Sequence, residues 1–212
     1  GNAILFITER YGMRAHASWG SLNDVMLVFM NQDAYDKFRL SKEDYELQKE
    51  LEKEQKSITE TKKNDKKKGD NKNKSEEKKE EKTKDIIVEL DNIEDRIVRL
   101  TPNSSDLGSA IITKNGETLY YLSAFEGGYD LWKMNLRKKD TKLLHKMDAG
   151  WANMEMDKDG KNLFLLGGSS MQKMSTDSES LKPVSYQANV KMDLAAERDY
   201  MFSHVYKQEQ KR

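Results

Sequence analysis

The 212-residue chain contains no cysteine, which excludes disulfide bonds and thiolate metal sites. Lysine plus arginine and aspartate plus glutamate each number 37, so the formal net charge is zero. Without a basic excess, the composition argues against a nucleic-acid partner or an anionic membrane surface. A signal peptide and an apolar run of membrane-spanning length are also missing, and the cellular compartment stays open.

Residues of the apolar set are absent from positions 59–85, where lysine and glutamate dominate. Such a segment cannot bury enough surface to offset the entropy lost on ordering, so we expect a flexible charged loop. Its nearly alternating charges argue against binding an acidic or basic partner. Before it, Ser41 is placed to cap a helix on which Leu47, Leu51 and Ile58 recur at helical spacing.

Short apolar runs of strand length occur in the rest of the chain, and one of them repeats. Residues 116–123 (GETLYYLS) match residues 160–167 (GKNLFLLG) at an offset of 44 residues, each after a turn-forming sequence. A second short strand follows each copy, at residues 130–135 and 171–175. Residues 1–8 (GNAILFIT) fit the same frame as a partial third copy.

A repeat period of about 40–45 residues with four strands per unit is typical of a β-propeller. The sequence therefore predicts an all-β fold, a partial β-propeller of four-stranded antiparallel blades. Two full copies and a fragment are fewer than the roughly 4–8 blades of a closed propeller.

The C-terminal residues differ in character from the repeat. Asp193 is placed to cap a helix that begins at Leu194, and Leu194, Met201 and Val205 form one apolar stripe on it. The predicted division of the chain has four parts: a partial blade (1–41), a charged insertion, first helical and then flexible (42–85), further blades (86–192) and the start of a helical core domain (193–212).

The turn and strand at residues 157–165 (DKDGKNLFL) resemble the repeat of tricorn-type propellers, in which a D-G-K turn precedes an apolar strand. Residues 11–19 (YGMRAHASW) and 192–198 (MDLAAER) are similar to the last propeller blades of bacterial tricorn protease homologues. In that family a helical core domain, a PDZ domain and a serine-peptidase core related to the C-terminal processing peptidases follow the propeller. The resemblance covers nearly the whole chain except the charged insertion. No position matches the family's catalytic motifs, so no catalytic residue is carried over.

The resemblance implies a non-catalytic propeller fragment that guides or filters peptide substrates toward a peptidase core outside this chain. The implied partners are peptides or unfolded polypeptides and the downstream domains of the same chain, and homo-oligomer formation stays open. The implied location is cytoplasmic, with the periplasm as the alternative. The alternative function is a binding or scaffolding propeller without a peptidase, and the sequence that follows Arg212 separates the two.

No residues of the sequence form a recognisable catalytic, cofactor-binding or metal-binding set. His16, His145 and His204 lack a second ligand at metal-binding spacing, and we expect His204 to be a packing or interface residue. Ser170 and Lys173 match the S-x-x-K spacing of a serine nucleophile. That chemistry requires a helix, whereas these residues lie between apolar strands, so the match is interpreted as chance.

Several other local patterns have a structural interpretation and a ligand-binding one. Residues 125–129 and 167–170 contain glycine pairs, but each pair joins two strands, which predicts hairpins and not phosphate loops. Residues 157–160 lack the later ligands of a calcium loop and are predicted to form a turn.

Five aromatic residues fit either packing between blades or a ligand-stacking surface: Trp19, Trp132, Trp151, Tyr120 and Tyr121. Packing is favoured for Trp132, which alternates with the polar Lys133. Trp151 falls between two blades, where innermost strands face the central channel, and both roles stay open for it.

Overall fold

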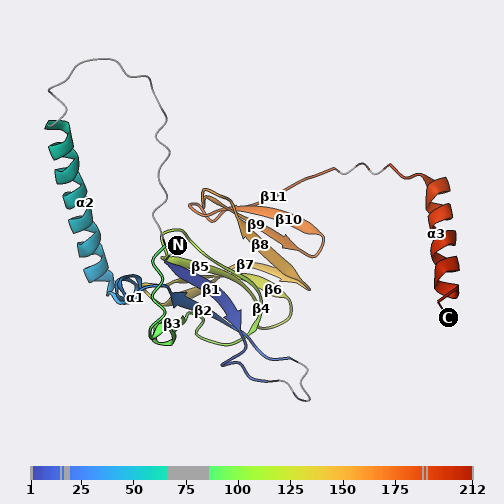
Figure 1. Cartoon of the computed structure of the whole chain (residues 1–212), viewed down its shortest axis with the longest axis horizontal. Coiled ribbons are helices and arrows are strands. Elements are labelled where there is room, and N and C mark those ends of the chain that lie inside the picture. Colours follow the sequence, from blue (N-terminus) through green and yellow to red (C-terminus); the bar gives the residue numbers. More distant parts are fainter. Residues whose placement is uncertain are drawn as a thin grey trace, which may run out of the picture.

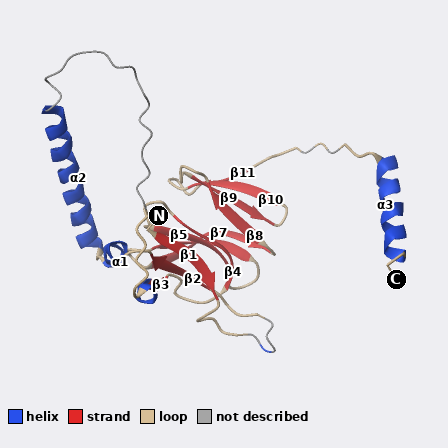
Figure 2. Ribbon diagram, viewed as in Figure 1, coloured by secondary structure: helices blue, strands red, loops and turns tan. Residues whose placement is uncertain are grey.

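A computed structural model describes residues 2–14, 16, 20–65, 86–187, 189 and 191–211, with backbone alone for 56–65. Three antiparallel sheets form its centre, and the α-helices lie outside them (Figures 1 and 2). Among the described residues, no helix is both long and apolar enough to cross a membrane.

The sheets follow one another along the chain. The first contains β1 (Ala3–Thr8), β2 (Asp24–Phe29) and β3 (Ile97–Arg99). The second contains β4 (Asp106–Ile112), β5 (Thr118–Ala124), β6 (Tyr129–Asn135) and β7 (Asp140–Ala149). The third contains β8 (Ala152–Met156), β9 (Asn162–Gly167), β10 (Ser170–Ser175) and β11 (Leu181–Pro183). Each pairs its strands in chain order, which confirms a partial β-propeller, although the first sheet has three strands.

The predicted repeat is visible in the turns that precede β5 and β9. In each turn the amide of a glycine donates to the carbonyl oxygen three residues earlier, at 2.8 Å for Gly116 and 3.0 Å for Gly160. The two turns also touch, because the Lys114 side-chain amine donates to the carbonyl oxygen of Lys158. Equivalent positions of the repeat therefore lie next to each other in space.

The second sheet packs between the other two. Leu119 and Tyr121 of β5 belong to a buried cluster with residues of the first sheet. Tyr120 and Leu122 belong to a second cluster with residues of the third sheet. Because successive residues of a strand point to opposite faces, this arrangement explains why β5 is apolar throughout. Of the two roles that the sequence left open for Tyr120 and Tyr121, their burial shows packing.

A helical arm is inserted between β2 and β3. It consists of α1 (Gln32–Arg39) and α2 (Lys42–Asp65), and a short 3-10 helix, η2 (Ile93–Arg96), precedes β3. The Ser41 hydroxyl accepts from the Asp44 amide at 3.1 Å, as expected of a cap. The backbone of α2 continues past Ile58 to Asp65, and positions 66–85 of the predicted flexible loop lie outside the described residues.

Arg137, in the turn between β6 and β7, attaches this arm to the second sheet. Its guanidinium donates to the carbonyl oxygens of Lys37 (3.1 Å), Phe38 (2.6 Å) and Leu40 (3.2 Å) at the C-terminal end of α1. The same group lies 3.9 Å from the centre of the Tyr45 ring in α2. One cation therefore satisfies helix-terminal carbonyls and stacks on an aromatic ring, which fixes the start of the arm.

The predicted C-terminal helix is α3 (Leu194–Glu209). The Asp193 carboxylate accepts from the amides of Ala195 and Ala196 at 3.1 and 3.2 Å, which confirms the predicted cap. The helix α3 lies apart from the sheets (Figure 1), and its apolar stripe, which includes Met201 and Val205, is exposed. That α3 begins a further domain stays a prediction.

Candidate functional site

The connecting segments at one end of the sheets form the candidate site. Two backbone hydrogen bonds between Asn23 and Ser105, at 2.7 and 3.0 Å, join the first and second sheets here, and within the third sheet the Gly168 amide donates to the Trp151 carbonyl oxygen at 3.2 Å. We call this surface the loop end, and it contains residues 9–14, 20–23, 101–105, 125–128, 147–151 and 168–169.

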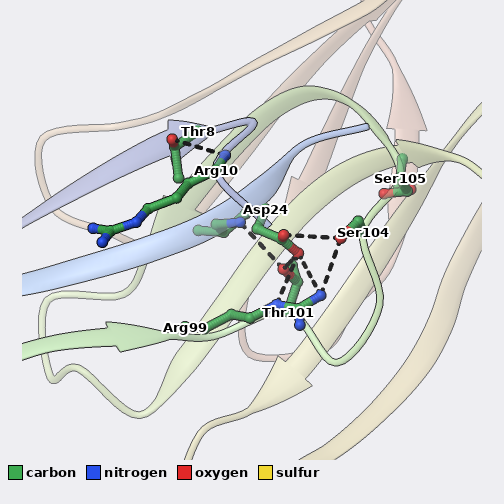
Figure 3. A network of polar contacts seen from close by, with 9 residues as sticks. Thr8, Arg10, Asp24, Arg99, Thr101, Ser104 and Ser105 are labelled. Carbon is green, nitrogen blue, oxygen red and sulfur yellow. Dashed lines mark hydrogen bonds and ion pairs between the residues drawn. The ribbon is translucent and has the colours of Figure 1, made fainter. Parts of the chain in front are cut away.

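Asp24 anchors the loop end at the start of β2 (Figure 3). Its side chain is fully buried, and its Oδ1 accepts from Arg99 Nε at 3.0 Å and from the Thr101 hydroxyl at 2.9 Å. Its Oδ2 accepts from the Ser104 hydroxyl at 2.8 Å. A buried carboxylate is tolerated only when it is paired and hydrogen-bonded, as it is here. The network therefore fixes the segment that leads from the first sheet to the second.

Sequence reasoning missed this network. Its members lie 75 to 80 residues from Asp24 along the chain, so no local spacing connects them. An aspartate at the first position of an otherwise apolar strand is a local signal, but it does not indicate which distant residues will bind it.

Two aspartates hold the loop between β5 and β6. Asp130 Oδ1 accepts from the amides of Met147 and Asp148 at 2.7 and 2.9 Å. Asp148 Oδ1 in turn accepts from the Gly128 amide at 3.0 Å. The approach is so close that a Cβ on Gly128 would lie 2.4 Å from the Asp148 carbonyl carbon. Only glycine fits there without displacing the backbone.

Gly128→Ala is therefore expected to lower the free energy of unfolding by about 1–3 kcal/mol, because the added methyl overpacks against backbone. Chemical denaturation followed by circular dichroism measures this change. Gly150→Ala is the matched control at the same loop end, because a Cβ there meets nothing within 4 Å. Equal stability of the two variants would contradict the close approach.

Two aromatic side chains project from these loops. Phe125 is 44% exposed and Trp151 is 50% exposed. The Phe125 ring also packs edge-on against the partly buried Trp132, with ring centres 5.1 Å apart. This contact holds one side of the Phe125 ring in place. Trp132 itself packs against the first buried cluster, as predicted, whereas Trp151 is available to a ligand. Trp19 lies outside the described residues.

Polar groups also lie at the loop end or next to it in sequence. The carboxylates of Asp106, Glu126 and Asp148 are exposed. Burial raises the pKa of the Tyr129 phenol, and its hydrogen bond with Asp106 raises it further. The phenol therefore stays neutral at physiological pH, and its one proton is used in the hydrogen bond with Asp106. Exposed aromatic surface and carboxylate acceptors are groups that can bind polypeptide.

The three histidines lie on three different elements. The Nε2 atom of His145 in β7 lies 3.0 Å from the carbonyl oxygen of Glu179. His204 in α3 stacks with Tyr200, with ring centres 6.2 Å apart, and His16 is exposed in the segment between β1 and β2. Within the described ranges, no group of three or more His, Cys, Asp or Glu residues is placed to hold a metal ion.

The other patterns singled out in the sequence occupy strands and turns. Ser170 and Lys173 lie on β10, where residues three apart point to opposite faces, so they do not converge. Both glycine pairs join hairpin strands, β5 to β6 and β9 to β10, as predicted. Asp157 accepts from the Lys161 amide and the Asn162 side chain at 2.8 and 2.5 Å, which confirms a turn. The Asn162 hydrogen bond lowers the pKa of the Asp157 carboxyl.

Comparison with known proteins identifies no family for this chain. No family model and no curated protein matches it. Among solved structures, TolB from Acinetobacter baumannii is similar over 43% of this chain and 24% of its own, at 15% identity and a TM-score of 0.38. The tricorn protease is similar over 46% of this chain and 9% of its own, at 15% identity and a TM-score of 0.40.

The class of the protein is defined by its own sheets. Consecutive antiparallel four-stranded sheets that pack face to face make it a β-propeller segment. The chain spans 24% and 9% of the two similar structures, and membership in the tricorn family is not shown.

Proposed function

We propose that this propeller segment is a non-catalytic module that binds extended polypeptide at its loop end. The exposure of Phe125 and Trp151 on short, hydrogen-bonded loops is the observation that carries the proposal. Aromatic side chains supply large contact area at low entropic cost and dominate many binding surfaces. Asp130 and Asp148 already hold these loops in place. Ligand binding therefore costs little further loss of conformational entropy.

The proposed destination of the bound polypeptide is a serine-peptidase core elsewhere in the parent protein. Its support is the resemblance of residues 157–165 to the tricorn-type repeat. A module that guides chains needs binding groups and no nucleophile–base pair of its own.

Removing both aromatic side chains is the direct test. Binding of reduced, carboxymethylated lactalbumin to the chain is measured by isothermal titration calorimetry. The double variant Phe125→Ala/Trp151→Ala is expected to bind at least tenfold more weakly, because truncating an anchor residue costs more than about 1.4 kcal/mol. Tyr186→Ala, which removes an exposed aromatic residue beyond β11, is the control and is expected to bind like the unaltered chain. Unchanged affinity of the double variant would overturn the binding site.

The guiding role has a separate test in the full parent protein. Trp151→Ala is expected to lower kcat/KM for unfolded polypeptide and to leave cleavage of short fluorogenic peptides unchanged. Short peptides can reach an active site without the loop end, whereas long chains need to be captured first. Equal effects on both substrates would contradict the guiding role, whereas the proposal of a binding site at the loop end would still stand.

A further inference from the structure

A groove of about 560 Å³ lies between α1 and α2 of the inserted arm, and we call it the arm groove. Six of its lining residues form one stripe on each side, three and then four positions apart: Asp33, Asp36 and Leu40 from α1 and its C-cap, and Asp44, Leu47 and Leu51 from α2. Residues at this spacing lie on one face of a helix. An ion pair between Lys37 Nζ and Glu52 Oε1, at 2.7 Å, connects the two helices.

Leucine side chains form the apolar middle of the arm groove. Leu47 is 58% exposed, Leu51 is 50% exposed, and Leu40 is half-buried. Helix α2 extends away from the sheets (Figure 1), and this face of it is open to solvent. Two helices that expose apolar stripes side by side offer a surface on which a third, amphipathic helix can pack.

Carboxylates lie along the same groove, since Asp33, Asp36 and Asp44 are all exposed. The Asp36 carboxylate accepts from the Gln32 side-chain amide at 2.9 Å, and that of Asp44 accepts from the Ser41 hydroxyl at 2.8 Å. Both of these donors are neutral. In the part of the chain that the structure describes, none of the three carboxylates forms an ion pair. They can therefore pair with cations of a ligand.

The arm groove carries a net negative charge. Lys37 also lines it, but Glu52 compensates the charge of this lysine. The N-termini of α1 and α2 each carry about half a positive charge, which together offset about one of the three carboxylates. About two negative charges therefore remain beside the leucines. A ligand that matches this surface combines an apolar stripe with lysine or arginine side chains.

Two other occupants lack this combination. Residues 59–85 contain no residue of the apolar set, so they cannot cover the leucines. The arm groove of a second copy would bring aspartates against aspartates, and like charges repel across an interface. A basic amphipathic helix supplies both the apolar stripe and the opposite charge.

We propose that the arm groove is a docking site for a basic amphipathic helix of a partner protein. The apolar stripe of that helix covers Leu40, Leu47 and Leu51, and its lysine or arginine side chains pair with the flanking aspartates. This site is distinct from the loop end and does not depend on the function proposed for it. Because Arg137 fixes the arm to the second sheet, docking here attaches the partner to the propeller itself.

A synthetic helix that carries only the stated chemistry tests the proposal. The probe is a fluorescein-labelled peptide of about 14 residues, or four helical turns, built from lysine with leucines three and four positions apart. Its binding to the 212-residue chain is measured by fluorescence anisotropy. Leu47→Gln is expected to weaken binding at least about tenfold, because it removes an apolar anchor from the middle of the arm groove. Leu143→Gln replaces a leucine of β7 that is 42% exposed, and this matched control is expected to bind like the unaltered chain.

The charge of the arm groove is tested by a second variant and a second peptide. Asp33→Asn/Asp36→Asn is expected to weaken binding about three- to tenfold and to reduce its salt dependence, because exposed ion pairs are modest and are screened by salt. Asp159→Asn, in the turn before β9, is the control and is expected to have no effect. A peptide with glutamate in place of every lysine is expected to bind the unaltered chain at least about tenfold more weakly. Equal binding of the two peptides would overturn the proposal.

The remaining outcomes separate the arm groove from other sites. Phe125→Ala/Trp151→Ala is expected to bind the lysine–leucine peptide like the unaltered chain, so the loop end and the arm groove can fail independently. If that variant lost binding while Leu47→Gln kept it, the peptide would belong to the loop end and the proposal would be overturned. Self-association of the unaltered chain that Leu47→Gln abolishes would assign the arm groove to a second copy and would also overturn it. The same holds if the unaltered chain does not bind the lysine–leucine peptide.

Discussion

Tyr121→Asp and Leu165→Asp are each expected to lower the free energy of unfolding by about 3–5 kcal/mol, because each places a charge in a dry core. Tyr121 lies in the buried cluster between the first and second sheets, and Leu165 in the cluster between the second and third. Burial raises the pKa of the Tyr121 phenol to about 12, which reflects how poorly this site holds a charge. Urea denaturation followed by circular dichroism measures the change.

Lys138→Asp is the control for these two substitutions. Lys138 is exposed in the turn between β6 and β7, so its replacement is expected to change stability by no more than about 0.5 kcal/mol. Equal tolerance at positions 121, 165 and 138 would show that the strands β5 and β9 are not core strands. The propeller assignment depends on that burial.

Asp24→Ala is the second substitution with a large expected effect. It leaves the Thr101 and Ser104 hydroxyls and the Arg99 guanidinium without their shared acceptor. Because Thr101 is itself buried, we expect the free energy of unfolding to fall by about 2–4 kcal/mol. The midpoint of thermal unfolding is the measurement.

Asp159→Ala is a matched control for Asp24→Ala, because Asp159 is an exposed aspartate in the turn before β9. Its replacement is expected to leave the midpoint within a degree or two. If both variants unfolded at the same temperature, the Asp24 network would have no part in holding the first sheet to the segment at residues 101–105.

The parts of the fold that the sequence predicted are those determined by local pattern. The repeat gave β5, β9 and their preceding turns, because apolar runs and turn residues recur at a fixed offset. The cap at Asp193 gave the start of α3 for the same reason. β3 carries no such local pattern, because it is three residues long and pairs with β2 across the whole inserted arm.

The candidate site was predicted only in part. The position of Trp151 between two repeats indicated a residue with access to ligand, and the structure leaves it exposed. For Phe125 the sequence indicates only a place next to a glycine pair. Its exposure depends on the backbone path set by Asp148 and Gly128, which no linear spacing reports. The Asp24 network was missed for the same reason.

The inserted arm has a consequence for the order in which the sheets assemble. In the second and third sheets, short turns join consecutive strands, so each sheet can form from contacts between near neighbours in the chain. In the first sheet, Asp24 and Arg99 are 75 residues apart, and their meeting requires closure of the loop that carries α1 and α2. Loop closure costs entropy before any contact compensates for it, and distant pairings slow folding. The second and third sheets are therefore the natural nucleus of folding, and the docking of β3 on β2 is its late step.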